Sequence, residues 1–377
     1  MGDKVRVGLV YGGRSGEHEV SLQTALAVMK AFDYTKYEIK PFYITKAGEW
    51  RAGTVLLAPP EGLELLRLSG GNATSGTEAL MPVFNGLADQ APAISSGTGA
   101  INETIDVVFP LLHGTFGEDG TIQGLLEMAN IPYVGAGVLA SAVGMDKITM
   151  KKVFAQEGLP QVIYRHFNRT QWDKDPAFFI MEIEVALGYP CFIKPANLGS
   201  SVGISKARNR EELIAGVKFA LRYDRKVIVE EFVDAREIEV SVLGNDDPRA
   251  SLPGEITSSS EFYDYKAKYT DGKSEMHIPA NIPAETAEAV REMAVRAFLS
   301  IDGSGLSRVD FFMRKEDGQL FINEVNTMPG FTPYSMYPLM WRESGVSYAE
   351  LLDTLIGLAI DRHAQKQRID YGAGDPV

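Results

Sequence analysis

A hairpin-like segment, residues 306–326, carries the most distinctive set of chemical groups in the sequence. A three-residue loop that ends on a left-handed Gly318 would place Asp310 opposite Glu324. Asn326, two residues further along the strand, would share that face. Carboxylate and amide oxygens suit Mg²⁺ that bridges nucleotide phosphates, so the spacing predicts a metal site. The solvated outer face of an edge hairpin is the alternative interpretation.

The residues around this hairpin extend the predicted site. Arg308 lies on the same face as Asp310, because side chains two residues apart in a strand point the same way. The predicted register also pairs Lys315 with Gln319. Residues 327–335 follow the hairpin directly and form a Pro/Gly-rich loop, whose backbone N–H groups could face a substrate oxyanion.

A second candidate site is a strand ending in Lys194 that runs into a loop of small residues, 196–203. Backbone N–H groups at its glycines, the hydroxyls of Ser200 and Ser201 and the charge of Lys194 could together cover phosphates. The loop does not match the P-loop pattern. An ordinary β-turn accounts for the same composition, and both interpretations stay open.

Two glycine-rich turns in the first third of the chain follow strand-like runs. Glu17, where a helix begins, could pair with the ammonium group of an amino acid. Alternatively, Ser15 caps that helix, and Glu17 and Glu19 complement its dipole. His113 opens the second turn at the carboxyl end of a strand, where open α/β sheets bind ligands.

The remaining patterns are less specific. Residues 262–269 are aromatic and charged without clear periodicity, which predicts a lid or, alternatively, an exposed strand. The histidines are scattered, and neither a His-Glu-x-x-His pair nor a Gly-x-Ser-x-Gly elbow occurs, so hydrolases are disfavoured. The glycines at 12–16 lack the dinucleotide fingerprint, which disfavours an oxidoreductase. Cys191 lies in an apolar run and predicts core packing.

These groups need a scaffold of strands and helices to bring them together. Strand-like runs at 5–10 and 105–112, each followed by a glycine turn and a helical pattern, predict a parallel sheet. The further expected elements are a single helix from about 141 to 158, strands at 192–194 and 226–230, and a helix at 209–221. Residues 45–104, rich in Gly, Ser, Ala and Pro, predict short strands and loops.

Length and composition limit the class of protein. A chain of 377 residues exceeds one ordinary core, and the α/β order predicts three domains, at 1–135, 136–230 and 231–377. A net charge of -13 opposes nucleic acid or an anionic membrane as partner. No apolar run reaches the roughly 18 residues of a membrane span. The chain starts without a signal-peptide pattern, so we expect a cytoplasmic protein.

Short motifs follow one another along the chain in a fixed order. They are Gly-Gly-x-Ser-x-Glu-x-Glu-Val-Ser, His-Gly-x-x-Gly-Glu-Asp-Gly, Met-Asp-Lys, Lys-Pro with Gly-Ser-Ser-Val-Gly, Tyr-Asp-Tyr-x-x-Lys-Tyr, Arg-x-Asp and Asn-Glu-x-Asn-Thr-x-Pro-Gly. In this order the chain resembles D-alanine:D-alanine ligases over about residues 5–355. The resemblance implies a three-domain ATP-grasp fold, in which an N-terminal parallel-sheet domain precedes two α+β subdomains that clamp ATP.

The resemblance also implies roles for individual residues. ATP would be contacted by Lys147, Lys194, Ser200, Ser201, Glu230, Glu237, Lys268, Asn323 and Glu324. Two Mg²⁺, or Mn²⁺, would be bound by Asp310, Glu324 and Asn326. The D-alanine substrates would be bound by Glu17, His113, Lys268, Arg308 and Ser335. The catalytic set would be Glu17, Ser200, Tyr269, Arg308 and Gly330.

The implied reaction makes D-alanyl-D-alanine for peptidoglycan. One D-alanine carboxylate attacks the γ-phosphate to give an acyl phosphate, and the amine of the second displaces phosphate. Tyr269, Ser200 and Glu17 would form a hydrogen-bonded link that closes the lid, and Tyr269 matches peptide-forming members. A homodimer is also implied. The alternatives are a D-alanyl-D-lactate or D-alanyl-D-serine ligase of the same fold, or a non-catalytic nucleotide-binding protein.

Overall fold

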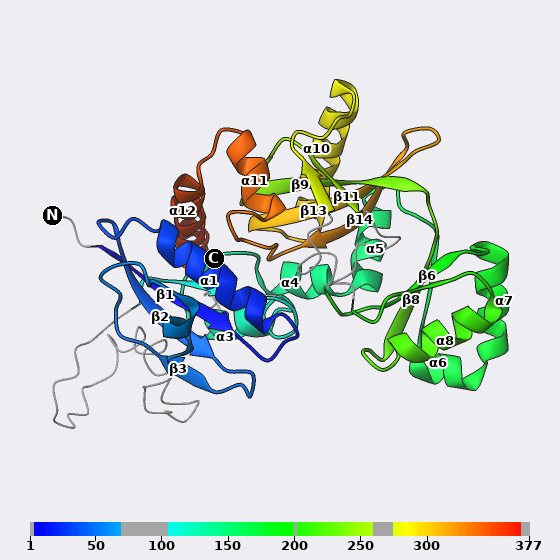
Figure 1. The fold of residues 1–377 in the computed structure, drawn as a ribbon, viewed down its shortest axis with the longest axis horizontal. Coiled ribbons are helices and arrows are strands. Elements are labelled where there is room, and N and C mark those ends of the chain that lie inside the picture. Colours follow the sequence, from blue (N-terminus) through cyan, green and yellow to red (C-terminus); the bar gives the residue numbers. More distant parts are fainter. Residues whose placement is uncertain (1–3, 69–104, 200–201, 259–273, 371–377) are drawn as a thin grey trace, which may run out of the picture.

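The computed structural model describes residues 4–68, 105–199, 202–258 and 274–370. The described strands form three sheets, and Figure 1 shows them arranged along the long axis of the molecule. Ser200, Ser201, Lys268, Tyr269, the predicted lid at 262–269 and much of the segment 45–104 lie outside the described ranges. Within these ranges, no helix combines the length and the apolarity needed to cross a membrane.

The first sheet has the strand order β3-β2-β1-β4. Strand β1 (Val5–Gly12) pairs in parallel with β2 (Tyr37–Ile44) and β4 (Val107–Leu111), which confirms the predicted parallel sheet. Strand β3 (Trp50–Ala52) is antiparallel. The helices of this part are α1 (His18–Ala31), the 3-10 helix η1 (Leu63–Arg67) and α3 (Thr121–Met128).

The central sheet is antiparallel and has the order β5-β8-β6-β7. Its strands are β5 (Tyr164–Asn168), β8 (Lys226–Glu231), β6 (Cys191–Pro195) and β7 (Ser205–Ala207). One face is covered by α6 (Arg169–Lys174), α7 (Pro176–Ala186) and α8 (Arg210–Ala220), as Figure 1 shows. The strands expected at 192–194 and 226–230 and the helix at 209–221 are confirmed, and Cys191 is buried in this core.

The third sheet follows the order β12-β11-β9-β13-β14, with β10 paired to β9. The strands are β9 (Ala235–Gly244), β10 (Arg249–Ala250), β11 (Gly254–Ser258), β12 (Ser274–His277), β13 (Gly305–Arg314) and β14 (Leu320–Asn326). Helix α10 (Ala284–Ser300) shares its core. Buried side chains of α12 (Tyr348–Lys366) and two of α11 (Met336–Glu343), Tyr337 and Trp341, instead join the core of the first sheet. Met336 and Met340 of α11 pack against Ile256 of β11.

The single helix expected from about 141 to 158 is wrong. Two helices occupy this stretch, α4 (Val138–Met145) and α5 (Lys147–Gln156). Between them Asp146 has an extended backbone, and its carboxylate accepts hydrogen bonds from the N–H groups of Ile148 (3.1 Å) and Thr149 (3.0 Å). Because a capping aspartate satisfies the free N–H groups of a helix start, it ends one helix and begins the next. Lys147 therefore lies in the first turn of α5.

The register of the hairpin β13–β14 differs from the prediction near its turn. Arg314, not Lys315, lies opposite Gln319, and the Arg314 N–H donates to the Gln319 carbonyl over 2.9 Å. Gly318 is left-handed as predicted, with φ +73°. An irregularity next to Asp310 then shifts the register by one residue, because Phe311 pairs with Ile322 while Asp310 pairs with Glu324. The predicted pairing of Asp310 with Glu324 is thus confirmed.

Candidate functional site

Three carboxylates form a row across neighbouring strands of the third sheet. Asp310 of β13 lies opposite Glu324 of β14 on one side and Glu239 of β9 on the other. Exposed fractions of the side chains are 6% for Glu239, 14% for Asp310 and 24% for Glu324. The row therefore forms a partly buried acidic surface and not a solvated outer face. Sequence analysis missed Glu239, because its strand pairing with β13 is long-range.

Arg308 is held at this row by two carboxylates. Its Nε and Nη2 donate to the two oxygens of Asp310 over 2.7 and 2.6 Å, and its Nε lies 3.1 Å from Oε2 of Glu239. Burial alone would lower the pKa of Arg308, but the charges of Asp310 and Glu239 outweigh this and raise the pKa. A guanidinium gripped in this way is fixed in position and permanently charged.

The amide of Asn326 completes the group. Its Nδ2 donates to Oδ2 of Asp310 over 3.0 Å, which turns the amide nitrogen toward the carboxylate and leaves the amide oxygen as the group's remaining acceptor. Asn323 is the extra residue in β14 at the register shift. Such a bulge redirects neighbouring side chains, and here it restores the alignment of Glu324 with Asp310.

Two lysines predicted to contact phosphates approach this acidic row from the central part of the chain. Lys147, at the start of α5, donates to the carbonyl of Leu198 over 3.0 Å, and its Nζ lies 3.2 Å from Oε2 of Glu324. Its own N–H donates to the carbonyl of Ala196 over 3.0 Å. Helix α5 therefore ties the loop after β6 to the carboxylates of the third sheet.

Lys194 of β6 lies beside Glu230 of β8. The Lys194 ammonium donates to Oε2 of Glu230 over 2.5 Å, and the other oxygen, Oε1, is 3.0 Å from Nζ of Lys151. Burial opposes ionisation of Glu230, but the two lysines lower its pKa to about 2. The pKa of Lys194 is raised, because the charge of Glu230 outweighs burial. Glu237 also lies close enough to raise the pKa of Lys194.

Glu17, from the first part of the chain, faces the same loop. It precedes α1 in the N-cap position but makes no side-chain capping bond. Ser15 is not the N-cap of α1, but its hydroxyl accepts from the N–H of Glu17 over 3.2 Å and donates to the carbonyl of His113 over 2.7 Å. Glu19 lies in the first turn of α1, so the capping alternative is confirmed in part. A Cβ placed on Gly199 would lie 3.8 Å from Oε1 of Glu17. The carboxylate of Glu17 is thus directed at the loop after β6.

His113 is buried where the first sheet meets the loop after β14. Its Nε2 is 3.2 Å from the hydroxyl of Thr24 and its Nδ1 is 3.2 Å from the carbonyl of Met328. Burial alone would lower the pKa of His113, but hydrogen bonding to Glu118 and the charges of Glu118 and Glu17 outweigh it and raise the pKa. His113 therefore links helix α1 to the loop after β14 through polar contacts.

Comparison with known proteins identifies the family to which this arrangement belongs. Residues 6–136 match the family model "D-ala D-ala ligase N-terminus", and residues 153–357 match "D-ala D-ala ligase C-terminus". The chain is 54% identical over 368 residues to the D-alanine–D-alanine ligase of Geobacillus thermodenitrificans, covering 98% of this chain and 99% of the relative. The chain belongs to the D-alanine–D-alanine ligase family.

Solved structures of similar ligases share the fold. The D-alanine-D-alanine ligase of Coxiella burnetii superimposes with a TM-score of 0.78 at 34% identity, covering 97% of each chain. A D-Ala:D-Ser ligase of Enterococcus faecalis gives 0.77 at 36% identity, covering 95% of this chain and 100% of that one. The likeness confirms the predicted α/β ATP-grasp fold of a D-alanine–D-alanine ligase.

In this ligase family member, the loop after β14 is anchored to the first sheet. A Cβ on Gly330 would lie 3.1 Å from Oγ of Ser335, so the two predicted substrate contacts adjoin each other. The N–H of Thr332 donates to Oγ of Ser335 over 3.1 Å. Phe331 between them is fully buried and packs edge-on against Phe109 of β4, with ring centroids 6.0 Å apart. The loop is therefore held firmly on both sides of Phe331, where Gly330 and Ser335 lie.

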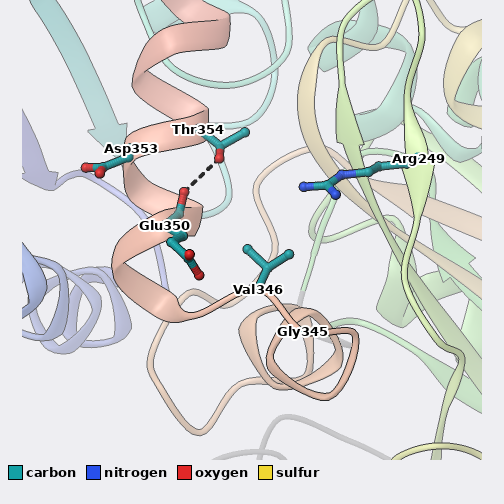
Figure 2. Close-up of a pocket in the computed structure, with 6 residues that line it drawn as sticks. All are labelled: Arg249, Gly345, Val346, Glu350, Asp353 and Thr354. Carbon is teal, nitrogen blue, oxygen red and sulfur yellow. Dashed lines mark hydrogen bonds between the residues drawn. The ribbon is translucent and has the colours of Figure 1, made fainter.

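A separate pocket of about 310 Å³ lies beside the start of α12, away from the predicted site residues of the ligase (Figure 2). It is lined by Arg249, Gly345, Val346, Glu350, Asp353 and Thr354. Its acidic groups have structural partners: Asp353 pairs with Lys36 at 2.7 Å, and Glu350 accepts from the N–H of Ser347 at 2.8 Å in a capping box. These partners explain its polar lining without a ligand.

Proposed function

We propose that the chain joins two D-alanines to D-alanyl-D-alanine, with ATP as the source of the phosphate in a D-alanyl phosphate intermediate. The observation that carries this proposal is the contact of Lys147 with Glu324 in the acidic row beside Arg308, with Glu324 also close enough to raise the pKa of Lys194. The family membership and the extent of the sequence identity support it further. The product would serve as a peptidoglycan precursor.

Mg²⁺ or Mn²⁺ fits the acidic row. Asp310 and Glu324 lie opposite each other on neighbouring strands. The amide nitrogen of Asn326 donates to Asp310, and its amide oxygen is left as an acceptor. No group of three or more His, Cys, Asp or Glu side chains with metal-binding geometry occurs within the described ranges, so two carboxylates and an amide are the set we propose. Two bound ions would neutralise the charge on the β- and γ-phosphates and orient them.

The side chains would divide the work between binding and charge stabilisation. Lys147 and Lys194, with Ser200 and Ser201, would hold the ATP phosphates. We assign the adenosine part to the backbone of Glu230 and the side chain of Glu237, with Asn323 and Lys268 as further contacts. Positive charge at the phosphates favours transfer to the carboxylate of the first D-alanine, because that transfer spreads negative charge over the phosphoryl oxygens.

In the second step, charge develops on the carbonyl oxygen under attack. Glu17 would hold the ammonium of the first D-alanine, with His113 beside it. Arg308 and the N–H of Gly330 would stabilise the oxyanion, because fixed donors cost no reorganisation as the charge forms. Ser335 and Lys268 would hold the carboxylate of the second D-alanine. A link from Glu17 through Ser200 to Tyr269 would keep the lid closed.

The fold does not decide between neighbouring substrates, because a D-Ala:D-Ser ligase resembles the chain as well as a D-Ala:D-Ala ligase does. We propose D-alanine as the second substrate because Tyr269 and Lys268 match peptide-forming members. We also propose that the enzyme acts in the cytoplasm as a homodimer, on small molecules and not on nucleic acid or membrane. The intact Arg308 and carboxylate row argue against a non-catalytic nucleotide-binding protein.

The test is phosphate release from ATP with Mg²⁺ and D-alanine, with the product identified by mass. L-alanine serves as the control substrate, and D-lactate and D-serine are added in competition across a range of pH. We expect dipeptide formation with D-alanine alone and its loss in Glu324→Ala. Preferred incorporation of D-lactate or D-serine at neutral pH would contradict the substrate assignment, and absence of D-alanine-dependent release would contradict the proposed function.

A further inference from the structure

Lys151 is a fully buried lysine next to the candidate nucleotide site. Its side chain is 1% exposed. Its Nζ lies 3.0 Å from Oε1 of Glu230 and 5.7 Å from the ring centroid of Tyr164. Lysines are almost never fully buried unless they are paired, so this position needs a specific reason. A group this deeply buried cannot touch a bound nucleotide directly.

Helix α5 carries two buried lysines next to two apolar core residues. Lys147 and Lys151 are four residues apart, which places them on the same face of the helix. Met150 and Phe154, three residues from Lys147 and Lys151 respectively, adjoin this face and pack in the core of the third sheet. In Figure 1, α5 lies between the third sheet and the strands β6 and β8. The helix thus carries both ammonium groups to the central sheet.

The charges of three side chains determine what Lys194 can offer to a phosphate. Lys194 and Lys151 each bind one oxygen of the same Glu230 carboxylate, at 2.5 and 3.0 Å. Burial lowers the pKa of Lys151 and the charge of Glu230 opposes that shift; with both lysines protonated, two cations and one anion leave one net positive charge. Without Lys151, Lys194 and Glu230 would form a neutral pair. The negative charge of Glu230 would then cancel the positive charge that Lys194 offers to the site.

We infer that Lys151 is a positioning residue for nucleotide binding: it neutralises Glu230, so that the charge of Lys194 remains available to the phosphates of ATP. This inference rests on the proposed function, which supplies the nucleotide. In this role Lys151 determines the sign of the charge at the phosphate site, although it never contacts the substrate. The alternative is that Lys151 only holds α5 against the central sheet.

The two roles make different predictions for Lys151→Met. With the charge of Lys194 offset by Glu230, binding of ATP and ADP should weaken by about tenfold or more, while adenosine, which has no phosphate, binds as before. Removal of one ion from a buried group costs stability, but Glu230 keeps Lys194 as its partner, so the variant should still fold. Lys152→Met is the matched control, since Lys152 is exposed, and should bind ATP like the parent.

The double variant Lys151→Met with Glu230→Gln decides between the roles. It removes one cation and one anion, so the net positive charge on Lys194 returns and ATP affinity should recover. Calorimetric titration with ATP, ADP and adenosine in the absence of D-alanine gives the three affinities. Recovery supports the inference, even if Lys151→Met alone fails to fold. A double variant that binds ATP as weakly as Lys151→Met, or a Lys151→Met variant with parental ATP affinity, would overturn it.

Failure of the proposed function looks different. A parent protein that binds ATP through this triad but shows no D-alanine-dependent turnover would refute the ligase assignment while leaving the role of Lys151 intact. A parent that turns over D-alanine normally, with no recovery in the double variant, would refute the role of Lys151 alone.

Discussion

The central sheet and the third sheet each bring a buried group of charged side chains to the site, and the two groups differ in sign. On the central sheet, Lys151 and Lys194 share Glu230, and cations are in excess. On the third sheet, Arg308 lies among Glu239, Asp310 and Glu324, and anions are in excess. Lys147 contacts both sides.

Each group contains one ion of the opposite sign. A buried charge without a partner is costly, so Glu230 and Arg308 stabilise the groups in which they lie. They also fix the positions of their neighbours. Each oxygen of Glu230 contacts a lysine, and two nitrogens of Arg308 donate to Asp310. The difference in sign suits two different ligands: the cationic side attracts the phosphates of a nucleotide, and the anionic side attracts metal ions. Three changes test this division, from the largest expected effect to the smallest, and a fourth tests the contact between the first sheet and the loop after β14.

Asp310→Asn should have the largest effect, because Asp310 is both a proposed metal ligand and the partner of Arg308. Loss of several kcal/mol of charge stabilisation corresponds to a fall in kcat on the order of 10³-fold. Chelation with EDTA should abolish parental turnover, and added Mg²⁺ should restore it. The assay is D-alanine-dependent phosphate release. Turnover that EDTA does not change would contradict the proposed division, since the anionic side would then have no metal to hold.

Arg308→Lys should lower kcat by roughly 10²- to 10³-fold, the range seen when one oxyanion donor is removed. Lysine keeps the charge but cannot donate to both oxygens of Asp310 as the planar guanidinium does. ATP affinity should change little, because Arg308 belongs to the anionic side. A variant that loses ATP affinity and retains kcat would place Arg308 among the nucleotide contacts instead.

Glu239→Gln should lower kcat by about tenfold, as for other residues that orient a functional group from behind. The amide can still contact Nε of Arg308 but without a charge. Thr257→Ala, at an exposed position on β11 of the same sheet, is the control and should be silent. Equal kcat in Glu239→Gln and the parent would show that Asp310 alone is sufficient to hold Arg308.

The smallest effect concerns His113, where the first sheet meets the loop after β14. Because its pKa is raised in the folded protein, its stabilising contribution is complete below the unfolded value of about 6.5 and declines as pH rises through the folded value. The difference in Tm between the parent and His113→Gln should therefore shrink from pH 6 to pH 9. A constant difference would mean that His113 stays neutral.

The sequence predicted the elements of this site better than their local details. The strands at 192–194 and 226–230 and the parallel first sheet followed from apolar periodicity and are confirmed. The pairing of Asp310 with Glu324 was predicted from a loop register that is wrong at Lys315, and the irregularity next to Asp310 corrects it. A bulge depends on packing between strands, and residue pattern alone does not reveal it.

Two charged residues escaped sequence analysis for a related reason. Glu239 reaches the row through pairing of β9 with β13, and Lys151 reaches Glu230 through packing of α5 on the central sheet. Both contacts are long-range. The four-residue spacing from Lys147 to Lys151 was the one available signal for Lys151, and that spacing does not reveal which carboxylate the second lysine meets. The roles of Ser200, Ser201, Lys268 and Tyr269 stay predictions.

The most direct test of the division between the two sides is ATP affinity with and without Mg²⁺ for Lys194→Met and Glu324→Gln. We expect Lys194→Met to weaken ATP binding under both conditions, because the charge of Lys194 acts on the phosphates themselves. Glu324→Gln should weaken binding with Mg²⁺ present and not without it. Equal losses for both variants, independent of Mg²⁺, would contradict the account, since the two sides would then act as one undivided site.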